Sequence, residues 1–136
     1  MEYEVLTENG RFIIQDAKRK YTIDLRERLL KFAVDTFKFL KTLPYNKEYE
    51  VFRYQLSKSS TSMGANYEEA QGSYSRNEFG SKIGICLKEA KETNYFYRVI
   101  QALEIGNCDE CKKLFKESDE LQKIFGSILT KVRSQK

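Results

Sequence analysis

Two cysteines three residues apart, Cys108 and Cys111, form the most chemically suggestive pair in this chain. At the start of a helix such a pair could act as a redox dithiol, because the helix dipole lowers the pKa of a thiol. No βαβ pattern surrounds the pair, and a structural zinc site needs about four ligands. The remaining cysteine is Cys86, and the sequence contains no histidine. We therefore interpret the pair as ordinary residues at a helix start, and we predict no cofactor and no metal.

Four glutamates, Glu68, Glu69, Glu89 and Glu92, could converge if the helices that carry them pack antiparallel. One interpretation is a carboxylate metal cluster, but the di-iron helix bundles that use such clusters also use histidines. We favour salt bridges instead. The candidate partners are Arg53, Lys88, Lys91 and Arg98. The missing histidine also excludes Ser–His–Asp and Cys–His arrangements within this sequence, so we predict that the protein is not an enzyme.

Residues 57–79 crowd polar side chains among small ones. Asn66 and Glu69 lie one helical turn apart there, and buried polar side chains must be hydrogen-bonded. We predict that Asn66, Glu69 and Glu92 form a structural polar network that fixes the alignment of the helices. Ser75 and Glu78 match the Ser-x-x-Glu capping box, in which each side chain bonds a backbone N–H near the other residue. A new helix should therefore begin at this point.

Basic residues are candidates for contact with phosphate. The net charge of +4 permits an acidic partner without requiring one. The possible nucleic-acid contacts surround the start of the first predicted helix and are Lys18, Arg19, Lys20, Arg26, Arg28 and Lys31. Such a patch could bind phosphates without sequence specificity, or it could be a solubilising surface. The aromatic run at 95–97 could stack on bases, but consecutive helical residues point in different directions, so part of it should lie in the core.

The elements that must position these residues are mostly helical. Residues 1–23 differ, because apolar residues alternate there around Asn9-Gly10, which predicts either a hairpin arm or a disordered tail. From Asp24 the apolar residues recur every three or four positions. We expect helices from 24 to Pro44, about 47–71, 75–105 and from 108 onward. The prediction is one all-α domain over 24–136, an antiparallel up-down-up-down four-helix bundle with a short N-terminal arm.

The predicted core faces follow from the same period. The first helix should bury Leu29, Phe32, Ala33, Phe37 and Leu40, and the second should begin its buried face at Val51. The first residues lack the basic and apolar regions of a signal peptide, and no apolar run reaches the length of a membrane span. With an odd number of cysteines, these features predict a cytoplasmic protein that makes no membrane contact.

An array of residues in the middle of the chain points to a known family. The array consists of Leu43-Pro44, Tyr54-Gln55-Leu56, Ser62, Asn66, Glu69, Gly72, Ser75, Glu78, Phe79, Ile85 and Glu92. With this array, residues 43–106 resemble the four-helix bundle proteins first associated with intervening sequences of bacterial 23S rRNA genes, also labelled S23 ribosomal proteins. The chain departs from that pattern at Ala70, where glycine is usual, at Ser73, where arginine is frequent, and at Lys88-Glu89, where Gly-Ser is frequent.

The resemblance implies a protomer without enzymatic activity that assembles into a homopentameric ring. A similar protein is the accessory factor of diversity-generating retroelements, where the basic surface of the ring binds RNA and the reverse transcriptase. We therefore predict an oligomeric accessory factor that binds RNA or a nucleoprotein. The alternative is a purely structural scaffold for protein–protein assembly, with no role in nucleic-acid binding.

Overall fold

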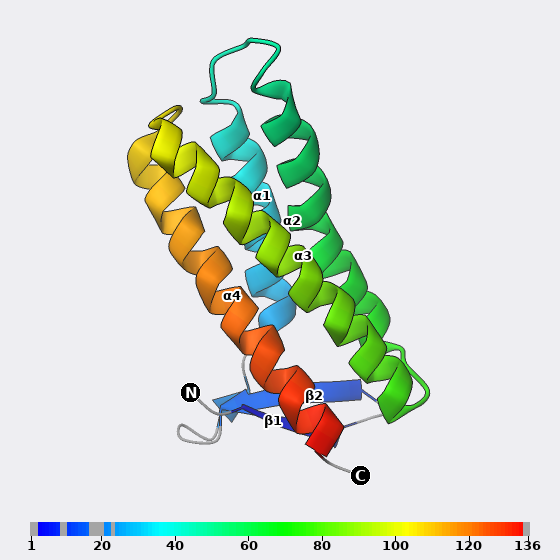
Figure 1. Cartoon of the computed structure of the whole chain (residues 1–136). Helices are drawn as coiled ribbons and strands as arrows, with labels where there is room; N and C mark the ends of the chain where they lie inside the picture. Colours follow the sequence, from blue (N-terminus) through cyan, green and yellow to red (C-terminus); the bar gives the residue numbers. More distant parts are fainter. Residues whose placement is uncertain (1–2, 9–10, 17–20, 23, 135–136) are drawn as a thin grey trace.

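The computed structural model describes residues 3–8, 11–16, 21–22 and 24–134. Within these residues it contains four helices: α1 (Leu25–Leu40), α2 (Glu50–Gln71), α3 (Arg76–Leu103) and α4 (Cys108–Ser134). Consecutive helices run antiparallel and pack against each other, and α4 closes back on α1 (Figure 1). The predicted four-helix bundle is confirmed. None of the described helices is both long and apolar enough to cross a membrane.

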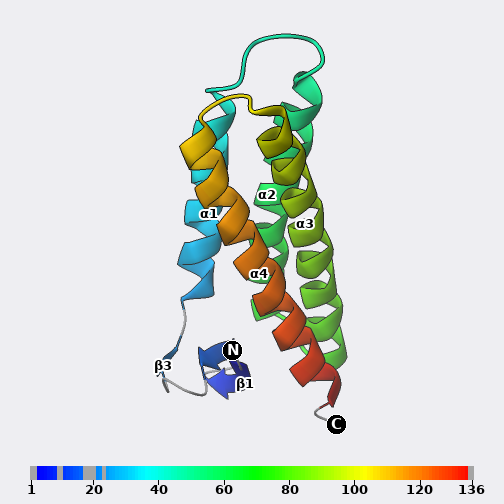
Figure 2. The same cartoon turned by 60° about the vertical axis from the view of Figure 1, so that its left-hand side comes forward.

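The N-terminal residues form a small antiparallel sheet in which β1 (Tyr3–Glu8) pairs with β2 (Arg11–Asp16), and β2 pairs with β3 (Tyr21–Thr22). Val5 lies opposite Ile14 in this register. The sheet lies across the end of the bundle where α4 finishes, with β1 against α4 and β2 against α2 (Figures 1 and 2). We call this the arm end of the bundle, and the opposite end, which carries the α1–α2 and α3–α4 connections, the loop end.

The two connections at the loop end contact each other. Gly106 has a φ of +73°, a left-handed conformation that favours glycine. A Cβ atom at this position would come within 2.9 Å of both Leu43 Cδ2 and Thr42 Oγ1. The backbone N–H of Asn107 donates a hydrogen bond to Thr42 Oγ1 at 3.0 Å. The α3–α4 turn is therefore seated directly on the end of α1.

The core faces of α1 and α2 differ slightly from the sequence prediction. Phe37 and Val51 are nearly half exposed, whereas their neighbours Phe39 and Phe52 are buried. The buried positions of α1 include Thr36, which is fully buried. Because Thr36 is polar, the apolar pattern alone placed Phe37 in the buried stripe, whereas in the structure Thr36 occupies that stripe and Phe37 faces solvent.

Candidate functional site

One turn of α3 forms hydrogen bonds to each of the other three helices. Thr93 Oγ1 lies 2.8 Å from Ser59 Oγ on α2, and Asn94 Nδ2 donates to Ser118 Oγ on α4 at 3.1 Å. The hydroxyl of Tyr97 donates to Thr36 Oγ1 on α1 at 2.7 Å. We call these six residues the polar belt: Thr36, Ser59, Thr93, Asn94, Tyr97 and Ser118. Because its members are buried or partly buried, each hydrogen bond is made away from water and favours a single alignment of the helices.

The residues predicted to form a polar network lie elsewhere. Asn66 is partly buried and donates to the backbone oxygen and the hydroxyl of Ser62 within its own helix, at 2.9 and 3.1 Å. Glu69 is exposed, because it lies on the outer side of α2, and its nearest cation is Lys82 Nζ at 3.6 Å. Glu92 is partly buried on α3. No hydrogen bond among the described residues joins these three side chains, so the structure does not bring them together.

Glu89 is a partly buried carboxylate on α3. Burial raises the pKa of this carboxyl, and the nearby charge of Glu92 raises it further. The Oε2 atom of Glu89 is buried and has no hydrogen-bond partner among the described residues. The other two glutamates of the predicted cluster point to separate cations, Glu68 to Arg26 and Glu69 to Lys82. The described residues contain no group of acidic or sulfur ligands placed to hold a metal ion.

Ser75 occupies the N-cap of α3. Its hydroxyl oxygen accepts a hydrogen bond from the backbone N–H of Glu78 at 3.0 Å. The carboxylate of Glu78 in turn accepts from the backbone N–H of Tyr74 at 3.0 Å. The first bond satisfies a backbone donor that the first turn of a helix would otherwise leave without a partner, and the second ties the residue before the cap to that turn. They fix the point at which the chain turns from α2 into α3.

The three cysteines differ in accessibility, and none is in a disulfide. Cys108 is exposed at the first position of α4, while Cys111 is buried and its Sγ lies 3.8 Å from the backbone oxygen of Tyr97. Burial raises the pKa of Cys111 to about 11 and that of Cys86 to about 12. A thiol with a raised pKa is a poor nucleophile, so the buried Cys111 lacks the low-pKa character of a redox-active thiol.

The basic residues predicted to contact nucleic acid are partly neutralised. Arg26 forms an ion pair with Glu68 at 2.7 Å, and Lys31 pairs with Asp35 on its own helix. Arg28 makes a two-point contact with Glu117 of α4, at 2.8 and 2.6 Å. The side chains of Lys18, Arg19 and Lys20 lie outside the described residues. Arg26, Arg28 and Lys31 therefore act in the structure mainly as links to neighbouring carboxylates.

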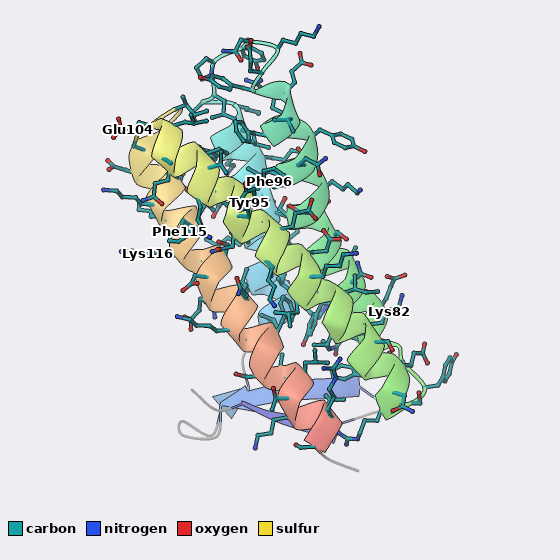
Figure 3. The ribbon with its side chains drawn as sticks, viewed as in Figure 1. Lys82, Tyr95, Phe96, Glu104, Phe115 and Lys116 are labelled. Carbon is teal, nitrogen blue, oxygen red and sulfur yellow. The ribbon has the colours of Figure 1, made fainter. Side chains whose placement is uncertain are left out.

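Positive charge gathers instead at the loop end. Residues 32–58 and 95–116, which build this end, contain nine Lys and Arg against six Asp and Glu. The rest of the helical region, residues 24–31, 59–94 and 117–134, contains ten of each. Lys112, Lys113 and Lys116 are exposed on α4, and Figure 3 shows Lys116 extending away from the bundle. The ion pairs of the described chain do not involve these three lysines.

The aromatic run on α3 divides among three environments. Tyr97 is fully buried within the polar belt, whereas Tyr95 is more than half exposed. Phe96 lies between them in exposure, and its ring packs against Phe52 at a centroid distance of 6.4 Å. Figure 3 shows Tyr95 and Phe96 side by side on α3. As the helical geometry predicts, the run does not form one continuous stacking surface.

Comparisons with known proteins agree on one family. The sequence profile of the 23S rRNA-intervening sequence proteins matches residues 22–127. The chain is also similar to a crystal structure of a protein with unknown function from the S23 ribosomal protein family of Bacteroides thetaiotaomicron VPI-5482. The two share 32% sequence identity with a TM-score of 0.70, over 77% of this chain and 97% of the other. No curated protein matches the sequence.

Proposed function

Because this chain belongs to the 23S rRNA-intervening sequence protein family, we propose that it is a non-catalytic, oligomeric accessory factor that binds RNA. Neither the family description nor the structural relative names a reaction. The RNA would bind at the loop end of the bundle, with exposed lysines contacting phosphates. The three free thiols of the protein suit the reducing conditions of the cytoplasm.

The observation that carries this proposal is the uneven distribution of charge. The cationic excess lies at the loop end, and Lys112, Lys113 and Lys116 there are exposed and lack carboxylate partners among the described residues. An unpaired lysine can exchange its counterion for a phosphate, whereas a paired one such as Lys31 must first give up its carboxylate. The loop end is therefore a better phosphate-binding surface than the start of α1.

Fluorescence anisotropy with labelled RNA tests the proposal. Binding should be strong at low salt and weaken steeply as salt rises. Reversing the charge of Lys112, Lys113 and Lys116 together should reduce the slope of log K against log salt by about 2, since each contact with a single strand contributes about 0.7. The matched control reverses Lys88 and Lys91, which are exposed on the middle of α3. Wild-type protein that binds no RNA at low salt would refute the proposal.

A second observation favours self-association. Leu30, Val34 and Phe37 lie one helical turn apart along α1 and are each more than 40% exposed. Apolar side chains at this spacing form a stripe on the outer face of the helix, which a second copy of the chain could cover. The pentamer implied by the family resemblance stays a prediction. Light scattering gives the copy number directly, and a Leu30→Glu, Val34→Glu variant should dissociate the assembly.

This stripe also supports the alternative function, a protein–protein scaffold without nucleic-acid binding. The RNA-binding titration and the light-scattering measurement together distinguish the two functions. A stable oligomer that binds no RNA at any salt concentration would support the scaffold. RNA binding by the wild-type protein would support the accessory factor, provided that the variant with Lys112, Lys113 and Lys116 reversed in charge (the loop-end lysine variant) shows the predicted smaller salt dependence.

A further inference from the structure

An open groove of about 670 Å³ lies at the loop end, beside the connection between α1 and α2. It is lined by Tyr45, Glu50, Arg53, Tyr54, Ser57 and Lys58. Two of these residues are aromatic and strongly exposed, Tyr45 at 84% and Tyr54 at 64%. Each exposed ring offers an apolar face on which another planar group can stack.

Arg53 holds one of these rings in position. Its guanidinium carbon lies 4.4 Å from the centre of the Tyr45 ring, a cation–π contact. Its Nη2 atom donates to the backbone oxygens of Leu43 and Pro44, at 2.8 and 3.0 Å, and so ties the connecting loop to α2. The Nη1 atom is buried and has no acceptor among the described residues. Tyr45 is thus presented on a fixed loop, and the Nη1 group of the arginine beside it has no acceptor among the described residues.

We propose that this groove binds single-stranded RNA, with bases stacked on Tyr45 and Tyr54 and a phosphate held by Lys58. The inference rests on the proposed RNA-binding function and names the form of RNA that is bound. Aromatic faces stack on bases that are not already stacked in a duplex, and such contacts tolerate any base because every base has a π-face. The exposed lysine adjoining the two rings supplies the backbone contact that stacking alone lacks.

At the Glu50 side of the groove, the charge favours contact with the bases of the RNA over contact with its phosphates. Its carboxylate repels a phosphate but accepts hydrogen bonds from the amino and imino groups of an unpaired base. These groups are engaged in base pairs within a duplex. Replacing Glu50 by glutamine should therefore strengthen RNA binding in general while reducing the preference for single strands.

A protein partner is the competing occupant, since tyrosine and arginine are also enriched at protein–protein contacts. Charge complementarity favours RNA. The groove belongs to the end of the bundle that carries the cationic excess, and Lys58 forms no ion pair among the described residues. Its open shape also suits a flexible strand that can enter from the side, rather than a ligand that must be enclosed.

The test uses the full-length chain and labelled single-stranded oligouridine and oligoadenine of about 12 nucleotides, within the usual site size for such strands. Tyr45→Ala and Tyr54→Ala should each weaken binding at least about five-fold, the loss expected for one stacked base. Tyr45→Phe and Tyr54→Phe should retain binding, because the ring remains. Tyr74→Ala is the matched control, since Tyr74 is 98% exposed but lies between α2 and α3 at the arm end.

Circular dichroism serves as the folding control, and each variant should be folded because these side chains are mostly in water. If the two alanine variants bind like wild type while the loop-end lysine variant binds weakly, this inference is wrong and the proposed function stands. The inference is also overturned if a duplex of the same length competes as well as the single strand. If wild-type protein binds neither RNA, the proposed function fails, and a protein partner becomes the better occupant of the groove.

Discussion

The hydrogen bond between Tyr97 and Thr36 offers the sharpest test of the polar belt. Both side chains are fully buried, and the hydroxyl of Tyr97 lies 2.7 Å from Thr36 Oγ1. Tyr97→Phe removes the donor but keeps the ring, which packs against Phe32 and Phe39 at centroid distances of 6.2 and 5.7 Å. The substitution therefore creates almost no cavity. What it leaves is a buried hydroxyl without its partner.

The expected cost follows from that unpaired group. Leaving one buried polar partner unsatisfied costs about 1 to 3 kcal/mol of unfolding free energy. Thr36→Val, which preserves the shape and removes the other partner, should cost a similar amount by stranding the Tyr97 hydroxyl. The double variant should cost less than either single one and should be close to neutral, because no polar group is then left without a partner. The coupling energy of this cycle should therefore be about 1 kcal/mol or more.

Urea unfolding followed by circular dichroism gives the unfolding free energy of the wild type, the two single variants and the double variant. The comparison requires the same slope m for all four proteins. Phe52→Leu provides a control in the core outside the belt, where only apolar packing changes. Two results would refute the reasoning. One is a Tyr97→Phe protein as stable as wild type. The other is simple additivity of the two substitutions, which would show that Tyr97 and Thr36 do not depend on each other.

Three further predictions concern the loop end and the cysteines. Gly106→Ala should lower the melting temperature and cost more than about 1 kcal/mol, because φ is positive and the new Cβ would meet Thr42 and Leu43. Gly126→Ala should be neutral or stabilising, since that helical position faces open space. An aromatic disulfide reagent should modify Cys108 at once and should reach Cys86 and Cys111 only after denaturation; rapid modification of all three would contradict their burial. Burial raises the pKa of Cys86 to about 12 and that of Cys111 to about 11, from an ordinary 9.0. Above pH 9 the folded state therefore keeps protons that the unfolded state loses, and the unfolding free energy should decline from about pH 9 to pH 11. A variant with alanine at both positions should show a shallower decline.

The sequence was sufficient to predict the four helices and their order. Apolar spacing and the Ser75 cap locate most helix ends because these signals act within a few residues of chain, although α1 ends at Leu40 rather than at the predicted Pro44. The polar belt was not predictable in the same way. Thr36, Ser59 and Thr93 interrupt apolar stripes on three different helices, and each is recognisable as a partner only after the helices are aligned.

The prediction of residues that contact nucleic acid was limited in the same way, because their partners lie far away in the sequence. Arg26 and Arg28 read as free basic residues in the sequence, but their carboxylate partners are 42 and 89 positions away. Glu69 illustrates the opposite case, since its small neighbours suggested burial while the helix turns it toward solvent. Tyr45 and Arg53 gave no local signal, because their contact depends on the path of the connecting loop.

The position of the polar belt along the bundle has a consequence for motion. The belt ties all four helices together at one level of α3, while the loop end and the arm end are held by separate contacts. Either end can then open by itself without releasing the alignment at the belt. In hydrogen exchange, backbone amides around residues 93–97 should be among the last to exchange, and their rate should report global unfolding. The surfaces at the two ends can adapt their shape while the centre keeps the helices in place.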